Sequence, residues 1–139
     1  MGLLSWFLED EEKQRKRVFI SFAIEDEKYR NDLVAQSKRA KSPFEFIDMS
    51  VKKKWTEKEW KKRCRTKIKG CDGVIALLSK NTHQAGGARW EMKCAKEEKI
   101  PIIGMHIKKN DKGAIPPELK GKRIIIWTWN NLEKFINSL

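Results

Sequence analysis

Five short apolar runs alternate with amphipathic stretches along this chain of 139 residues, and this alternation limits the possible fold more than any other feature. The runs lie at residues 17–23, 44–48, 74–78, 100–107 and 123–127 and carry many β-branched and aromatic residues, as strands do. Strands that alternate with helices predict a parallel sheet with helices on both faces. We therefore expect an α/β, flavodoxin-like fold of three layers, with a five-stranded parallel sheet in the order 2-1-3-4-5.

Helices are predicted at residues 25–38, from Thr56 to Gly70, from the loop after the third strand to Lys99, and at 129–139. Thr56 and Glu59 form a capping-box pattern, which indicates where the second helix begins. One stripe of that helix is suited to packing on a core; it holds Trp60, Cys64, Ile68 and Cys71. We expect residues 17–139 to form one domain, and residues 1–16 to be an amphipathic appendage that packs on it, covers a sheet edge, or meets a partner or a membrane.

The net charge of +12 favours polyanions in general. The basic residues are scattered over predicted helices rather than gathered with aromatic residues, so a nucleic-acid site is the weaker interpretation, although the charge keeps it open. The three cysteines form no CxxC pair and no metal-ligand spacing with histidine, so we expect no metal. Their odd number and the lack of a secretory signal predict reduced thiols and a cytoplasmic protein, and no segment is long enough to span a membrane.

The candidate site is the stretch at residues 83–95, which joins the third strand to a helix through a glycine-bearing loop. Ligands of open α/β sheets bind just beyond the carboxyl ends of the strands, where this loop lies. At 100° per residue Ala88, Met92 and Ala95 form one small apolar stripe, and Glu91 lies on its shoulder, pointing toward the sheet edge. On spacing alone, the simpler interpretation is an acidic residue in a first helical turn, which the helix dipole favours.

Several nucleotide chemistries are excluded by the motifs. The chain has no Walker A sequence and no GxGxxG. The third strand ends in Leu78 and Ser79, which does not fit the phosphate acceptor of a response regulator.

Three segments resemble a known family. Residues 18–22 and the acidic helix start after them resemble the opening of a TIR (Toll/interleukin-1 receptor) domain. Residues 42–51, and residues 82–87 leading to Glu91, are similar to the TIR-like group of the MTH538 type, which includes ThsB, the TIR-like subunit of Thoeris antiphage systems. The resemblance covers residues 16–107 and implies a TIR-like fold.

The resemblance also implies an enzyme of bacterial antiviral defence. Such an enzyme cleaves the nicotinamide–ribose bond of NAD, its substrate, and makes an ADP-ribose-derived signal, cyclic or conjugated, for a separate effector. Glu91 matches the catalytic glutamate of enzymatic TIR domains. A phage-derived trigger and self-association are further partners that the family implies.

Other side chains are candidates for substrate contact. Phe22, Ala23 and Trp90 can offer an apolar surface to the rings of NAD. Pyrophosphate donors can come from Ser50, from lysines 52–54 and from Arg89, and Asp48 belongs to the same motif as Ser50. His83 is a candidate acid–base group, although a lone loop histidine is more often a surface residue.

One departure from the family keeps an alternative open. Many TIR enzymes that hydrolyse NAD carry tryptophan four residues before the glutamate, whereas this chain has Gly87 there and Trp90 beside Glu91. The alternative is a non-enzymatic interaction module that assembles through the loop after the second strand, residues 49–55.

Overall fold

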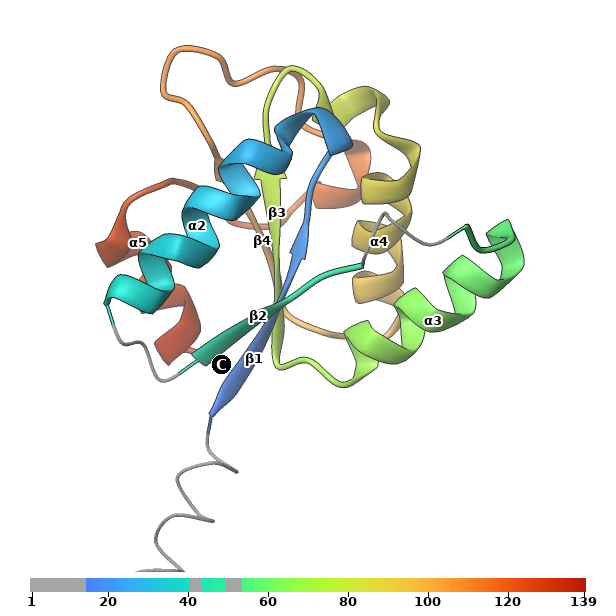
Figure 1. Cartoon of the computed structure of the whole chain (residues 1–139). Coiled ribbons are helices and arrows are strands. Elements are labelled where there is room, and N and C mark those ends of the chain that lie inside the picture. Colours follow the sequence, from blue (N-terminus) through green and yellow to red (C-terminus); the bar gives the residue numbers. More distant parts are fainter. Residues whose placement is uncertain (1–14, 41–43, 50–53) are drawn as a thin grey trace, which may run out of the picture.

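The computed structural model describes residues 15–40, 44–49 and 54–139. Its five strands are β1 (Lys16–Ser21), β2 (Phe44–Ile47), β3 (Gly73–Leu78), β4 (Ile102–His106) and β5 (Ile124–Ile126). All neighbouring strands pair in parallel, and the sheet has the order β2-β1-β3-β4-β5 (Figure 1). The predicted strand order and direction are confirmed.

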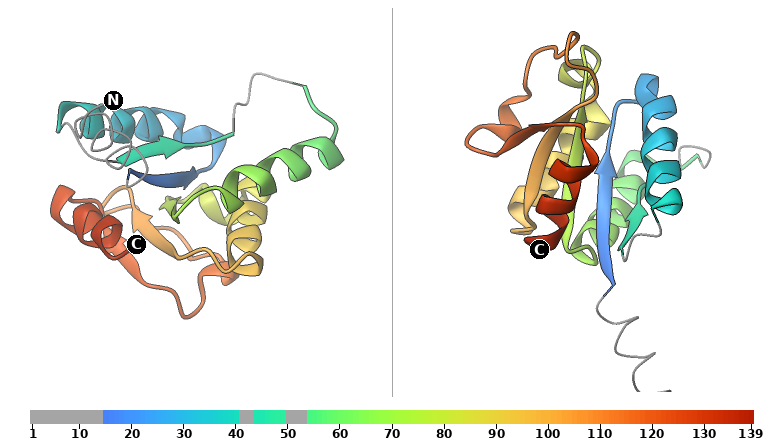
Figure 2. Two further views of the ribbon diagram at one scale, coloured as in Figure 1. Left: turned by 90° about the horizontal axis from the view of Figure 1, so that it is seen from below. Right: turned by 90° about the vertical axis from the view of Figure 1, so that its left-hand side faces the viewer.

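Helices cover both faces of this sheet, as the alternation predicts. They are α2 (Glu27–Arg39), α3 (Glu57–Lys69), α4 (Gly86–Glu97) and α5 (Trp129–Asn137). Figures 1 and 2 show α2 and α5 together on one face and α3 and α4 together on the other. Three short 3₁₀ turns were not predicted; they are η1 (Ile24–Asp26), η2 (Thr82–Gln84) and η3 (Pro117–Leu119).

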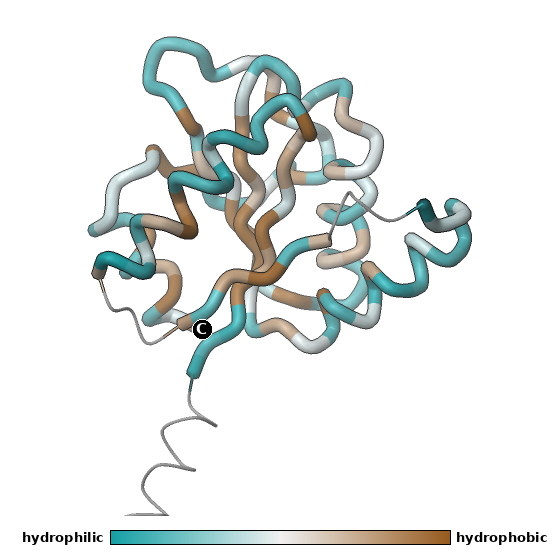
Figure 3. Tube along the Cα trace, viewed as in Figure 1, coloured by the Kyte–Doolittle hydropathy of each residue, from teal (hydrophilic) through white to brown (hydrophobic). Residues whose placement is uncertain are grey.

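The core consists of two apolar clusters, one on each face of the sheet. All six residues of β3, the central strand, are buried, and the tube of Figure 3 is most hydrophobic along the strands. Since successive side chains of a strand point to opposite faces, Phe19 and Ser21 of β1 lie on the face of α3 and α4, and Val18 and Ile20 on the face of α2 and α5. A buried serine at the end of β1 is therefore aimed at α4.

The helix ends follow the predicted capping signals in part. Thr56 Oγ1 accepts a hydrogen bond of 3.2 Å from the backbone N–H of Glu59, and Gly70 follows the last residue of α3. The helix α4 begins at Gly86 without a side-chain cap, earlier than the start at Trp90 and Glu91 that a first-turn acid implies. Glu91 thus lies in its second turn, and the interpretation of Glu91 as a first-turn acid is wrong.

Cys64, Cys71 and Cys94 are buried free thiols, as predicted. The predicted appendage, residues 1–16, falls outside the described residues except for Arg15 and Lys16, and Lys16 is already part of β1. Among the helices of the described residues, none has the length and apolar character that crossing a membrane requires.

Gly104 of β4 is a point where the core leaves no room for a side chain. A Cβ atom there would lie 2.7 Å from methyl groups of both Ile124 and Leu78. We expect Gly104→Ala to lower the free energy of unfolding by about 1–3 kcal/mol, because the surrounding side chains must shift. Urea unfolding of Gly104→Ala and of Gly86→Ala, whose Cβ would enter open space, measures the difference. Equal stability of the two variants would contradict the tight packing over β4.

Candidate functional site

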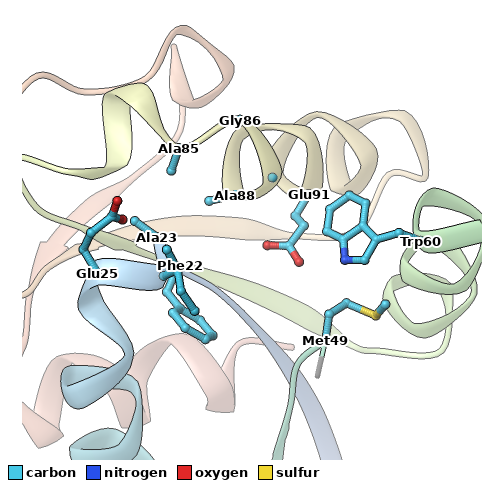
Figure 4. Close-up of a pocket in the computed structure, with 11 residues that line it drawn as sticks. Phe22, Ala23, Glu25, Met49, Trp60, Ala85, Gly86, Ala88 and Glu91 are labelled. Atoms are coloured by element: carbon cyan, nitrogen blue, oxygen red, sulfur yellow. The ribbon is translucent and has the colours of Figure 1, made fainter. Parts of the chain in front are cut away.

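A cavity of about 240 Å³ opens at the carboxyl ends of β1 and β2, beside the first turn of α4 (Figure 4). The chain leaves β1 toward α2 on one face of the sheet and leaves β3 toward α4 on the other. Such a switch point separates the two connections and creates a crevice. Typical pockets for drug-sized ligands measure roughly 300–1,000 Å³, so this cavity suits one end of a dinucleotide. Its lining residues are Phe22, Ala23, Ile24, Glu25, Met49, Trp60, Ala85, Gly86, Gly87, Ala88 and Glu91.

Glu91 is the buried acid of this pocket, with an exposed fraction of 6%. Its carboxyl group points toward the sheet, as the helical phase predicts, because Ser21 Oγ lies 2.9 Å from Oε1. Cys64 of α3 donates its Sγ–H to Oε2 over 3.6 Å. The carboxyl group is thus held by β1 and α3 at once.

Burial raises the pKa of Glu91 to about 8, and the negative charge of Asp48 acts in the same direction. The hydrogen bonds from Ser21 and Cys64 favour the ionised form and oppose this rise. Ser21 Oγ also lies 3.0 Å from the carbonyl oxygen of Ala88, so its single hydrogen faces two acceptors. A protonated Glu91 satisfies every group, since Oε1–H then donates to Ser21 Oγ and Ser21 donates to Ala88. We conclude that burial keeps Glu91 largely as a neutral acid at pH 7.

Two aromatic side chains border the space in front of this acid. Phe22 follows β1, and Trp60 comes from the first half of α3; Figure 4 shows the Glu91 carboxyl group projecting between them. Glu25 supplies a second carboxyl group, and no lysine or arginine is among the described residues that line the pocket. The site therefore combines aromatic surface with acidic groups in a chain whose net charge is +12.

Three of the residues predicted from the sequence, Phe22, Ala23 and Glu91, meet in this pocket. Trp90 does not line it. Its ring packs against Trp60, with centroids 5.4 Å apart, while Lys61 and Arg65 lie over it. Trp90 lies on the side of α4 that faces α3. It therefore packs behind Trp60 and supports that residue's position in the pocket lining.

The remaining predicted contacts are placed elsewhere. Asp48 accepts a hydrogen bond from Arg30 Nε, and its backbone carbonyl accepts one from Lys67 Nζ, so it acts on the pocket through its charge alone. His83 is exposed in η2 and is absent from the lining. Ser50 lies outside the described residues, as do lysines 52 and 53.

Arg89 forms a two-pronged ion pair with Glu118, at 3.0–3.2 Å, instead of facing the pocket. This pair joins α4 to η3, which lies within the long loop before β5. The prediction that Arg89 faces a pyrophosphate therefore does not fit its place in the structure.

Sequence reasoning missed the contributions of α3. Trp60 and Cys64 were interpreted as core residues of one stripe, and that stripe does face α4. Because Cys64 contacts Glu91, a residue one turn earlier on the same stripe must come near the same acid. The spacing of Trp60 and Cys64 was thus a usable signal. Gly86 and Gly87 belong to the predicted stretch at residues 83–95, and Met49 and Glu25 lie in segments that carry the family resemblance, although neither was singled out as a contact.

Ser21→Ala is expected to destabilise the protein by about 1–3 kcal/mol, because it leaves a buried carboxyl oxygen without its partner. Ser37→Ala is the matched control, because that hydroxyl bonds only within its own helix, to Val34. Thermal unfolding of both variants tests the expectation. An equal loss of stability in the two variants would show that the hydrogen bond to Glu91 adds no stability beyond that of an ordinary hydroxyl contact.

Comparison with protein families gives one match that spans more than half of the chain. A family model described as the TIR-like domain of the Thoeris protein ThsB matches residues 19–112. This range includes all the described lining residues of the pocket. A comparison with curated proteins finds no matching sequence.

Solved structures with a similar fold include three proteins of different kinds. The TIR domain of the Toll-related receptor TRR-2 from Hydra magnipapillata is 15% identical, with a TM-score of 0.58, and the match covers 87% of this chain and 91% of that one. A 2-deoxyribosyltransferase from Bacillus psychrosaccharolyticus is 14% identical, with a TM-score of 0.61 and coverage of 84% and 90%. The CMP N-glycosidase BcmB of Clostridium botulinum is 19% identical, with a TM-score of 0.55 and coverage of 88% and 97%. At these identities the likeness extends to the fold alone.

Proposed function

The chain belongs to the family of the TIR-like domain of the Thoeris protein ThsB, and from this premise we propose that it cleaves the nicotinamide–ribose bond of NAD in the pocket around Glu91. The product is an ADP-ribose-derived signal, cyclic or conjugated, that a separate effector of an antiphage system reads. The observation that carries the proposal is a buried carboxyl group between two aromatic walls at the switch point of the sheet.

The chemistry needs few groups. When the bond between the ribose C1′ and the pyridinium nitrogen breaks, the nitrogen keeps the electron pair and nicotinamide leaves as a neutral molecule. The ribose becomes an oxocarbenium ion, whose positive charge a nearby carboxylate stabilises. A hydroxyl or ring nitrogen of the same nucleotide, water, or a second acceptor then attacks C1′, and the proton that a hydroxyl or water loses in this step passes to solvent. Glu91 is the acid placed for this role, and no separate general acid is required.

The protonation state of Glu91 fits a cationic substrate. A pyridinium ribose in the pocket brings a positive charge close to Glu91, and an opposite charge favours the ionised carboxylate. The substrate thus lowers the pKa from about 8 and generates the catalytic form when it binds.

The first turn of α4 can hold the polar part of the nucleotide. Ala85 gives no side-chain cap, and the first backbone N–H groups of any α-helix have no partner within it. Gly86 and Gly87 let a ligand approach these donors closely. Ribose hydroxyls or phosphate oxygens are suitable acceptors, at the positive end of the helix dipole.

Two of the structural neighbours make the proposal chemically plausible. Their names denote a 2-deoxyribosyltransferase and an N-glycosidase, that is, the transfer of a sugar group and the cleavage of an N-glycosidic bond. A fold of this kind is therefore compatible with breaking the bond between a sugar and a nitrogen heterocycle.

Mass spectrometry tests the proposal. Concentrated protein is incubated with NAD, alone and with lysate from phage-infected cells, and the nucleotides are analysed. We expect free nicotinamide and a new ADP-ribose species. Intact NAD under every condition, together with assembly that depends on the loop at residues 49–55, would instead favour the non-enzymatic interaction module.

A further inference from the structure

Trp60 and Gly87 lie next to each other in the lining of the pocket. A Cβ atom on Gly87 would lie 3.7 Å and 3.8 Å from two carbon atoms of the Trp60 indole. An alanine methyl group there would make ordinary van der Waals contact with the ring, whereas a bulky side chain at position 87 would compete with the indole for space. The aromatic wall thus comes from α3, and α4 is bare at the matching position.

The position of Trp60 is fixed from behind. Trp90 of α4 packs on it, and Arg65 lies over the Trp90 ring with its guanidinium carbon 5.5 Å from the centroid. Arg65 in turn forms a 2.7 Å ion pair with Glu98 just after α4. These contacts hold α3 against α4, so the indole is a preformed wall.

The chemistry of the lining defines what this wall can bind. Opposite Trp60 lies Phe22, and the ionisable side chains among the described lining residues are the acids Glu25 and Glu91. An aromatic face beside carboxyl groups binds a flat ring that is neutral or positively charged, and indole gives the strongest attraction for a cation.

We propose that Trp60 is the stacking residue for the heteroaromatic end of the substrate, and that the small residue at position 87 leaves room for its indole. This inference rests on the proposed function for the identity of the ring, nicotinamide. It assigns substrate binding to α3, whereas the sequence pointed to Trp90.

Calorimetric titration of NAD into Glu91→Gln protein, which cannot turn the ligand over, provides the test. Loss of one base–aromatic stack is worth roughly five- to hundredfold in affinity, so Trp60→Ala is expected to raise Kd by that factor. Trp60→Phe should stay within about threefold of the parent, because a ring remains. Trp127→Ala is the matched control; this tryptophan packs against the core cluster on the opposite face of the sheet and should leave Kd unchanged.

A reciprocal exchange separates stacking from simple loss of structure. Gly87→Trp alone should weaken NAD binding, since the new ring collides with Trp60. Combined with Trp60→Ala, it should restore at least part of the affinity, because an aromatic wall then comes from α4 into the vacated space. Such non-additivity is expected only of residues in contact.

Three results would overturn the inference. They are an unchanged Kd in Trp60→Ala, an additive loss in the double variant, and no NAD binding to the Glu91→Gln parent. The proposed function fails separately: if NAD binds and its binding depends on Trp60 while the wild-type protein leaves NAD intact, the stacking role stands and the cleavage does not.

Discussion

Glu91→Gln is expected to reduce NAD cleavage by about 10²–10³-fold while leaving the protein folded. The amide of glutamine has the shape of the protonated acid, and its N–H and C=O groups can replace the donor and the acceptor that neutral Glu91 offers to Ser21 and Cys64. It cannot become a carboxylate beside the oxocarbenium ion, so the stabilisation of that charge is lost. The rate of nicotinamide release, measured at saturating NAD, gives the effect.

Glu97→Gln is the control for this prediction. Glu97 is the last residue of α4, with a half-exposed side chain 3.6 Å from Arg65, so the same chemical change occurs on the same helix outside the pocket. We expect its activity to equal that of the wild type. Loss of activity in Glu91→Gln together with a lowered melting temperature would count against a chemical role, as would equal activity in both variants.

The second large effect is the pH dependence that the raised pKa of Glu91 imposes on activity. Because kcat/KM reports ionisations of the free enzyme, it should rise about tenfold per pH unit up to about 8 and then level off. The cationic substrate favours the carboxylate, so kcat should reach its plateau at a lower pH than kcat/KM. Steady-state kinetics between pH 6 and about 9.5 measure both curves. Two flat profiles would contradict the assignment of Glu91 as the ionising group.

The free energy of unfolding should also depend on the ionisation of Glu91, and it should fall over the pH range in which activity rises. The pKa of Glu91 is about 8 in the folded protein and 4.5 ordinarily, so between these values the folded protein keeps a proton that the unfolded chain has released. The free energy of unfolding then falls as pH rises, by at most about 1.4 kcal/mol per unit. His106 acts in the opposite direction below 6.5, because burial lowers its pKa and the unfolded chain gains the proton. Burial also raises the pKa of Cys64, Cys71 and Cys94, which adds a fall in stability as pH approaches 9. The contribution of Glu91 is the part of the slope between pH 6.5 and 8 that urea unfolding of Glu91→Gln should lack.

The strands and their order were predictable because each apolar run is short, rich in β-branched residues and separated from the next by a helix or a long loop. The direction of the Glu91 side chain toward the sheet was predictable because Glu91 lies next to the apolar stripe of Met92 and Ala95 on the helix. These are local patterns, and a buried face imposes them on the sequence directly.

The rest of the pocket depends on contacts between distant segments. Gly86 and Gly87 are poor helix formers, so the early start of α4 was not evident from propensity. A tryptophan beside Glu91 suggested a substrate contact, yet Trp90 packs on Trp60, a residue thirty positions away that borders the pocket instead. Arg89 forms its ion pair with Glu118, which lies in the loop before β5. No periodicity within one helix specifies such partners.

A crystal structure of the Glu91→Gln variant with NAD tests the central claim most directly. We expect the nicotinamide ring between Phe22 and Trp60 and the ribose C1′ in contact with the side chain at position 91. Nicotinamide bound anywhere else on the molecule, with this pocket empty, would contradict it.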